Sequence, residues 1–475
     1  DAAMTTSRSE CQINYRYERR FDYQKNVSDQ DVHSGLARGR FDLIPKVLSM
    51  EAGALAARSR SDIRGAAPLQ GVGNIDNVTQ VYSAFAGPTL ATRVGPLDVT
   101  AAYRLGYTAV DAGRTVSIPG GQPALDKYDD SINHFATASV GMDSGSLPFG
   151  WTVSGSYERE DAGQLDQRFE SKYIRGDVVV PVTPTVALVG GVGYEDIESS
   201  QRDALLYAGG NVAVDAKGRF ITDPTSPRRL AYDQDGMFFD AGVLWKPSRR
   251  TSLEARVGRR YGSLSYTGAF SWQMTSNSGF QVGIFDTVET FGQQLNDNLS
   301  RLPTSYSAPR NRLVNTNGGC VFGGQGSGGC LNDAFQSINT AAYRSRGVSA
   351  VWTAGRGPWK TGVGVGYVRR DYSAPIQAGV FSVNGLTDQS WYAQGNVDYA
   401  LSDHETVSGD VVVSYYEPGI TGAGDVLSTG ATGSYNRTFG RNLSAGATLG
   451  LYSYRQDNFD SNLTVSAFAG MRYSF

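Results

Sequence analysis

Apolar and polar residues alternate along most of this chain, most clearly in its last fifteen residues. From Leu463 to Tyr473 every second residue is apolar, and most of the positions between them are polar. A period of two is the period of a β-strand that has one apolar and one polar face. The pattern recurs in about twenty segments bounded by Gly, Pro, Ser and Asn turns. It predicts an all-β chain.

The composition decides which way the apolar faces point. The chain has 58 Gly and 26 Tyr among 475 residues, and its mean hydropathy is -0.31. This composition suits strands that are wet on one face and lipid-facing on the other. The sequence contains no apolar run long enough for a transmembrane helix. We therefore predict one outer-membrane β-barrel over residues 1–475, an antiparallel sheet of about 20 strands (roughly 18–22) in a Gram-negative bacterium.

The connections between these segments fall into two classes. One class is short and rich in Pro, Gly, Ser or Asn, as at Pro96 and Pro247, whereas the other varies widely in length. Outer-membrane barrels have short periplasmic turns and long extracellular loops. Residues 198–235 and 296–343 are therefore predicted to be long extracellular loops, and residues 1–11 the remnant of a preceding strand. The chain starts at Asp1 and shows no signal peptide, so we expect the numbering to begin after processing.

The chain end resembles the C-terminal strand signal of bacterial outer-membrane proteins. Its residues are Met471, Tyr473 and the terminal Phe475. The expected partners are the barrel-assembly machinery, outer-membrane lipid and lipopolysaccharide, and polysaccharide or envelope proteins. At net charge -3 the chain has no basic bias for nucleic acid.

Two of the three cysteines lie close together in a Gly-rich stretch, at Cys320 and Cys330. We predict a disulfide between them, which fits an oxidising compartment; two unpaired thiols are the alternative. The three histidines are scattered, so no metal site is predicted. No nucleophile and base stand together, so neither an enzyme nor a cofactor is expected.

Charged residues occupy the polar face of several strands. Parity places them in the lumen, where they either tune solute selectivity or pair across strands as a polar wall. The predicted lumen-facing charges are Arg104, Glu158, Arg175, Asp177, Glu254, Arg256, Arg260, Asp398, Asp410 and Arg472.

Several blocks of the sequence resemble one family. The blocks are Tyr15–Arg20, Asn77–Tyr82, Gly193–Asp196, Gly242–Leu253 and Phe291–Leu295. Together they are similar to the uncharacterised outer-membrane β-barrel proteins associated with the PEP-CTERM/exosortase system, in their sphingomonad-like members. The resemblance implies an outer-membrane place and a link to exopolysaccharide genes. It also implies strand sequence before the segment that matches Asp1, and it supplies no catalytic residues.

Three functions are compatible with such a barrel. The first is a porin-like channel for solute diffusion or exopolysaccharide export, since a barrel of this size encloses a lumen. The second is a scaffold plugged by its own long loops, which anchors envelope partners. The third is a fragment of a TonB-dependent-type transporter, disfavoured because no plug of about a hundred residues precedes the barrel here.

Overall fold

The structure, a computed structural model, describes residues 2–20, 30–65, 77–111, 125–145, 147–306, 319–324, 327–377, 379–440, 442–457 and 461–473. Twenty-one strands form one sheet. Every ladder in it is antiparallel, and each strand pairs with its neighbours in sequence, except that β14 pairs with β17. The prediction of an all-β antiparallel fold with about 20 strands is confirmed.

The first half of the sheet runs up and down from the N-terminus. Its strands are β1 (Ala2–Thr5), β2 (Ser9–Arg20), β3 (Gln30–Ile44), β4 (Leu48–Arg60), β5 (Val78–Val94), β6 (Leu97–Val110), β7 (Asp130–Met142), β8 (Gly150–Ala162), β9 (Gln167–Pro181) and β10 (Val186–Gln201). Residues 1–11, interpreted as a strand remnant, thus contain β1 and the start of β2.

The second half continues in the same way. Its strands are β11 (Arg229–Ser248), β12 (Thr251–Arg260), β13 (Ser263–Thr275), β14 (Ser278–Glu289), β17 (Ala342–Arg356), β18 (Trp359–Ser373), β19 (Thr387–Ser402), β20 (Glu405–Glu417), β21 (Val426–Phe439), β22 (Leu443–Gln456) and β23 (Asn462–Tyr473). Among the described residues no ladder joins β23 to β1.

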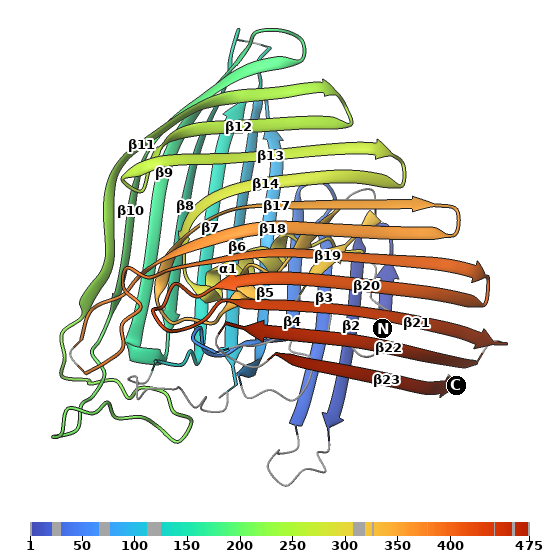
Figure 1. Ribbon diagram of the computed structural model, residues 1–475. Coiled ribbons are helices and arrows are strands. Elements are labelled where there is room, and N and C mark those ends of the chain that lie inside the picture. The colour runs from blue at the N-terminus through green and yellow to red at the C-terminus, as the bar shows by residue number, and fades with distance from the viewer. Residues whose placement is uncertain are drawn as a thin grey trace.

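The sheet curves round an interior. In Figure 1 its early strands cross behind the late ones, and the helix α1 (Phe291–Arg301) lies between them. Most of the short turns, such as residues 45–47 and 357–358, join strands at one end of the sheet, whereas the two-residue turn 261–262 between β12 and β13 lies at the other end. At the other end lie the long connections, among them residues 202–228 and 290–341.

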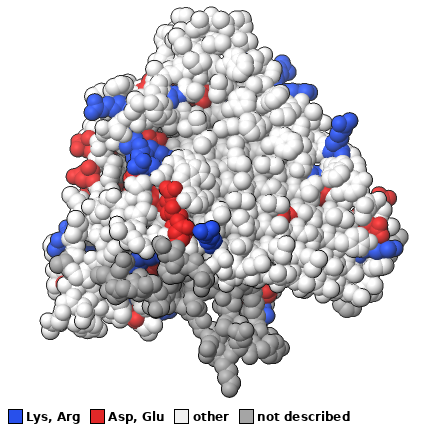
Figure 2. Space-filling model, in the orientation of Figure 1, with Lys and Arg blue, Asp and Glu red and all other residues white. Residues whose placement is uncertain are grey.

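The outer face of the sheet is apolar. Exposed side chains on it include Ile174, Val178 and Val180 of β9, Leu449 and Leu451 of β22, and Leu463 and Val465 of β23. Trp245, Trp359 and Phe439 are exposed beside short turns, where an aromatic girdle is expected. Figure 2 shows a broad uncharged area over the middle of these strands, with charged side chains gathered toward the strand ends. An apolar band of this kind is typical of the lipid-facing wall of a membrane barrel.

Two predicted boundaries are wrong. The described part of residues 296–343 does not form a loop outside the barrel, because it continues α1 into the interior and ends in β17. The loop expected at 198–235 is shorter than predicted, because β10 and β11 extend into it and leave 202–228.

Candidate functional site

Residues 290–306, 319–324 and 327–341 fold into the lumen, and we call them the lumen insert. Their first part is α1, which contacts β4, β5, β6 and β7. Phe291, Leu295 and Leu299 recur every four residues, and all three are fully buried. They pack against inward-facing residues of the wall, including Leu55, Val81 and Phe85. An apolar stripe at this spacing holds one face of a helix against a wall.

Both ends of α1 are capped. The Thr290 hydroxyl accepts from the Gln293 amide, and the Gln293 side chain accepts from the Thr290 amide at 3.0 Å. This capping box satisfies two amide groups at the start of the helix. At the other end the Arg38 guanidinium donates to the carbonyls of Ser300 (2.8 Å) and Leu302 (3.1 Å). A buried strand residue therefore holds the C-terminus of the helix.

The middle of the insert is a hairpin, β15 (Cys320–Phe322) and β16 (Gly328–Cys330). Cys320 and Cys330 face each other across it and form a disulfide, so this prediction is confirmed. The hairpin packs on Val351 and Tyr392 of the opposite wall. Since α1 lies against β4–β7 and the hairpin against β17–β19, the insert crosses the lumen from wall to wall.

Two of three glycines on one face of β18 make room for the hairpin, and the third, Gly366, makes room for the Tyr392 ring. Gly362, Gly364 and Gly366 occupy alternate positions, so they share one face of the strand. A Cβ on Gly362 would lie 2.5 Å from the Phe322 ring, and one on Gly364 would lie 2.4 Å from the Cys320 sulfur. Glycine in a strand marks this kind of close approach. We call these three residues the glycine track.

The last part of the insert is anchored by an ion pair. Arg370 of β18 and Asp388 of β19 are almost fully buried, and the Arg370 Nε donates to Asp388 Oδ1 at 2.9 Å. Arg370 also donates to the Ser337 hydroxyl of the insert at 2.8 Å. The hydroxyls of Tyr372 and Tyr416 donate to the same carboxylate, each at 2.9 Å. A buried pair satisfied on all sides in this way holds a single geometry.

Loops cover the long-loop end of the lumen, and we call residues 202–228 and 374–386 the mouth cap. The Gln377 side chain exchanges two hydrogen bonds with the backbone of Ala204, at 2.7 and 2.9 Å. Asp126 accepts from the Gln164 amide group at 2.6 Å and from the Phe220 backbone. Burial among these loops raises the pKa of Asp126 to about 7. The cap thus contains a carboxyl that titrates near neutral pH.

One elongated cavity remains between the insert and the wall formed by β12, β13 and β14. Its volume is about 580 Å³. Its lining runs from Ser252 and Gln281, near the short turns, to Glu289 at the far end of β14. Eight residues separate Gln281 from Glu289, which corresponds to about 26 Å of extended strand. We call this space the lumen passage.

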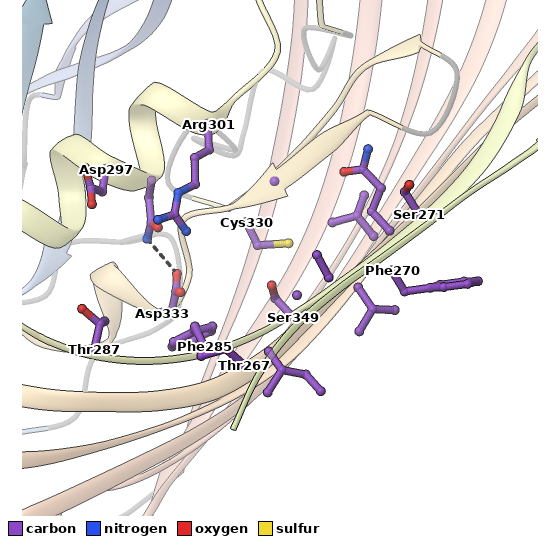
Figure 3. A pocket seen from close by; sticks show the side chains of 18 of the residues that line it. Thr267, Phe270, Ser271, Phe285, Thr287, Asp297, Arg301, Cys330, Asp333 and Ser349 are labelled. Carbon is purple, nitrogen blue, oxygen red and sulfur yellow. Dashed lines mark hydrogen bonds between the residues drawn. The ribbon is translucent and has the colours of Figure 1, made fainter. Parts of the chain in front are cut away.

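Acidic groups outnumber basic ones along the passage. Its ionisable lining consists of Glu254, Asp286, Glu289, Asp297, Asp333 and Arg301. Figure 3 shows Asp297, Asp333 and Arg301 on the insert side of the cavity, opposite Thr267 and Ser271 of the wall. Asp333 accepts from Asn298 at 3.3 Å, and burial raises its pKa to about 6. Three of the five carboxylates are paired with arginines, namely Glu254, Asp286 and Asp297. The acidic excess that favours cations over anions therefore rests on Glu289 and Asp333 against Arg301.

Four of the predicted lumen charges and their neighbour form one network. Arg175 binds Asp177 (2.7 Å) and Asp240 (2.6 Å), and Arg256 binds the same two carboxylates at 2.7 and 3.0 Å. The result is a ring of alternating charges across four strands. It closes over Gly191, where a Cβ would lie 2.3 Å from Arg175. Glu254 extends the ring toward the passage, accepting from Arg256 at 2.6 Å.

The remaining predicted charges lie in separate places. Arg104 binds Asp297 of the insert at 2.8 Å, and Arg260 binds the buried Glu195 at 2.6 Å. Glu158 accepts from Asn133 at 3.3 Å, Asp410 accepts from Thr432 at 3.3 Å, and Asp398 lines a second cavity. The side chain of Arg472 and the whole of Phe475 lie outside the described residues, whereas Met471 and Tyr473 are exposed on the outer face. Whether these charges select solutes stays a prediction.

The sequence interpretation missed α1 and the glycine track. Both carry a signal in the sequence. Thr290 and Gln293 have the spacing of a capping box, just before the repeat of Phe291, Leu295 and Leu299. The glycine track lies in the segment Thr361-Gly-Val-Gly-Val-Gly-Tyr367. Only one face of this strand carries side chains, because every second residue is glycine.

Comparisons with solved structures return proteins of the outer membrane. The chain aligns over 100% of its length with 79% of the FrpB iron transporter from Neisseria meningitidis (F5-1 variant), at 11% identity and a TM-score of 0.45. It aligns over 97% with 78% of the siderophore receptor PiuA from Acinetobacter baumannii, at 10% identity and a TM-score of 0.46. With the ferric-catecholate import receptor Fiu from E. coli K12, 99% of this chain aligns with 78% of that protein, at 12% identity and a TM-score of 0.47. These similarities concern the course of the backbone alone.

No protein-family model matches the chain, and no curated protein matches it significantly. Within the described part of the chain no helix is long and apolar enough to cross a membrane. The apolar outer wall, the polar interior and the two classes of connection together place the chain in the outer membrane of a Gram-negative bacterium.

Proposed function

We propose that this protein is an outer-membrane channel through which small polar solutes move along the lumen passage, with cations favoured over anions. One observation carries the proposal: a polar cavity follows β14 for nearly its whole length, although the insert crosses the rest of the lumen. A barrel sealed for anchoring alone would have no need for such a cavity. The porin-like interpretation is thereby limited to ions and small solutes that fit this narrow path. Exopolysaccharide export would require the insert to move.

The insert sets the size of what can pass. It is anchored on both walls, by the apolar stripe of α1 and by the buried pair Arg370–Asp388. Moving the insert would remove the two hydrogen bonds that Arg370 donates to Ser337. A hydrogen bond to a charged group is worth about 1.5–3 kcal/mol, so the insert stays in place under ordinary thermal motion. A polymer would require the insert to move, whereas ions and small solutes would not.

The mouth cap makes conduction conditional. The path from outside runs beneath residues 202–228 and 374–386, which are joined through Gln377 and Ala204. Few hydrogen bonds hold this contact, and loops of this kind open locally at low cost. Conduction should therefore occur in bursts, as the cap opens and closes.

A scaffold barrel is the second candidate, favoured by the wall-to-wall insert. The two functions differ in the current that the protein carries in a planar bilayer. A channel gives small steps whose reversal potential in a KCl gradient indicates K⁺ preference. Glu254→Gln should weaken that preference, because Glu254 lines the passage and is 42% exposed. Asp410→Asn is the matched control, since Asp410 lies on the lumen face of β20 away from the passage. An absence of current at all voltages and pH values would refute the channel and leave the scaffold.

A further inference from the structure

A row of aromatic rings crosses the outer face of the wall near the long-loop end of β18, β19 and β20. Tyr367, Trp391 and Tyr415 stand side by side there, with ring centroids 5.0 and 5.7 Å apart. Eight residues separate Tyr367 from Trp359 beside the short turn, which corresponds to about 26 Å of extended strand. The apolar band of an outer-membrane barrel is about 25 Å tall and lies between two aromatic girdles. The three rings therefore mark the outer border of that band.

Two arginines lie on the same face just beyond the rings. Arg346 of β17 and Arg369 of β18 are direct partners in the ladder, and their side chains are 38% and 43% exposed. Arg369 is two residues from Tyr367, so its side chain lies one step farther from the apolar band than the ring. Like charges directly opposite each other destabilise a sheet. An anion between the two guanidiniums removes this cost.

The protein itself supplies only part of the compensating charge. Asp371 accepts from both guanidiniums, at 3.0 Å in the case of Arg369. On the other side of Arg346, its ladder partner Asp286 is held by Arg344 through two contacts of 2.7 Å. Three guanidiniums thus stand against two carboxylates, and one positive charge remains at the border of the apolar band.

A third donor lies beside the two arginines. Gln389 of β19 is the ladder partner of Arg369. Its side-chain oxygen accepts from the Tyr367 hydroxyl at 2.7 Å, so its amide group remains to donate. Guanidiniums bind phosphate oxygens through parallel N–H groups. The three side chains together suit an anion with several acceptor oxygens, as a phosphate has.

The surroundings of the pair indicate which phosphate it meets. Long loops are extracellular in outer-membrane barrels, so the pair faces the outer leaflet, which consists of lipopolysaccharide in Gram-negative bacteria. Val348 and Val365, on the membrane side of the arginines, are exposed and available to acyl chains. A phosphate carried on acyl chains meets both surfaces at once, whereas a free phosphate meets the arginines alone. We propose that Arg346 and Arg369 bind a phosphate of lipid A, the acylated part of lipopolysaccharide.

The test of this site needs no current and does not depend on the channel. Lipid A with both of its phosphates is titrated into the detergent-solubilised full chain, and bound lipid is counted by native mass spectrometry. Arg346→Gln and Arg369→Gln should each weaken lipid A binding about fivefold, because each removes one charge-assisted contact at an exposed site. The double variant should lose more than either single variant. The gel mobility of unheated protein shows whether each variant is folded.

Arg437→Gln is the matched control. Arg437 lies on the outer face of β21 at the short-turn end, is 50% exposed and pairs with Glu405 at 3.1 Å, so its loss should leave lipid A binding unchanged. Equal lipid A binding by the wild type and the folded double variant would overturn the site. Equally tight binding of dephosphorylated lipid A would also overturn it, since the acyl chains alone would then account for binding. An equal loss of phosphatidylglycerol binding in the double variant would refute the assignment to lipopolysaccharide and indicate a site for any lipid phosphate.

Discussion

Replacing Gly364 with valine should lift the disulfide hairpin away from β18 and push it toward the lumen passage, which Gly328, Gly329 and Cys330 of the hairpin line. A Cβ at this position would lie 2.4 Å from the sulfur of Cys320 and 2.7 Å from that of Cys330. Non-bonded heavy atoms prefer separations of about 3.5–4.0 Å, so the hairpin must move by about 1 Å or more. The disulfide joins both of its strands, and the hairpin therefore moves as a unit. Overpacking of this kind costs about 1–3 kcal/mol.

The assay is single-channel conductance in planar bilayers, with the gel mobility of unheated protein as the test of folding. Gly364→Val should give smaller steps than the wild type, because the displaced hairpin narrows the passage, and a lower melting temperature. Gly433→Val is the control, because Gly433 lies exposed on β21 and a Cβ there meets no atom within 4 Å. It should change neither quantity. If Gly364→Val folds and conducts like the wild type, the hairpin does not limit the passage. Gly364→Ala is the milder variant should the valine prevent folding.

Three further predictions concern the cap, the wall and the helix. Because the pKa of Asp126 is raised, this carboxyl stabilises the cap most below pH 4, and the stabilisation is lost as pH rises through about 7. Hydrogen exchange of residues 202–228 should accelerate over this range. Asp126→Asn should abolish the pH dependence. Arg256→Met leaves Asp177 and Asp240 with the guanidinium of Arg175 as their one shared partner in the ring. The melting temperature should fall by a few degrees, and the preference for K⁺ should increase. Unchanged ion selectivity would show that the ring does not act on the passage. Thr290→Ala removes the N-cap of α1 and the hydroxyl that bonds to Glu160, at a cost of about 1–2 kcal/mol in urea unfolding. Thr429→Ala, on the exposed outer face of β21, should cost less, and equal costs would contradict the capping.

The fold follows from the sequence because barrel strands are local patterns. The alternation from Leu463 to Tyr473 and the Pro-marked turns predict strands, their parity and the face that meets lipid. Parity also placed Arg175, Asp177 and Arg256 on one face, where the structure joins them through Asp240. The partner was missed because pairing across four strands depends on register, which a single sequence does not reveal.

Long loops that plug the barrel were one predicted alternative, but the helix and the hairpin of the lumen insert were not predicted, for a physical reason. Residues 296–343 are polar and rich in glycine, which is equally typical of a solvent-exposed loop. A segment that folds into a polar, water-filled lumen needs few apolar residues. The apolar stripe of Phe291, Leu295 and Leu299 is therefore short and gives only a weak helical signal. The glycine track carries even less local information, since its meaning lies in the segment that packs on it.

The most direct test of the account is the single-channel conductance of the wild type beside a variant lacking the hairpin, residues 319–330, replaced by a short Gly-Ser linker. The account predicts small, K⁺-preferring steps from the wild type and much larger, weakly selective steps from the deletion, because the hairpin fills the space between α1 and β17–β19. Equal conductance from two folded proteins would contradict it, since the insert would then not define the passage.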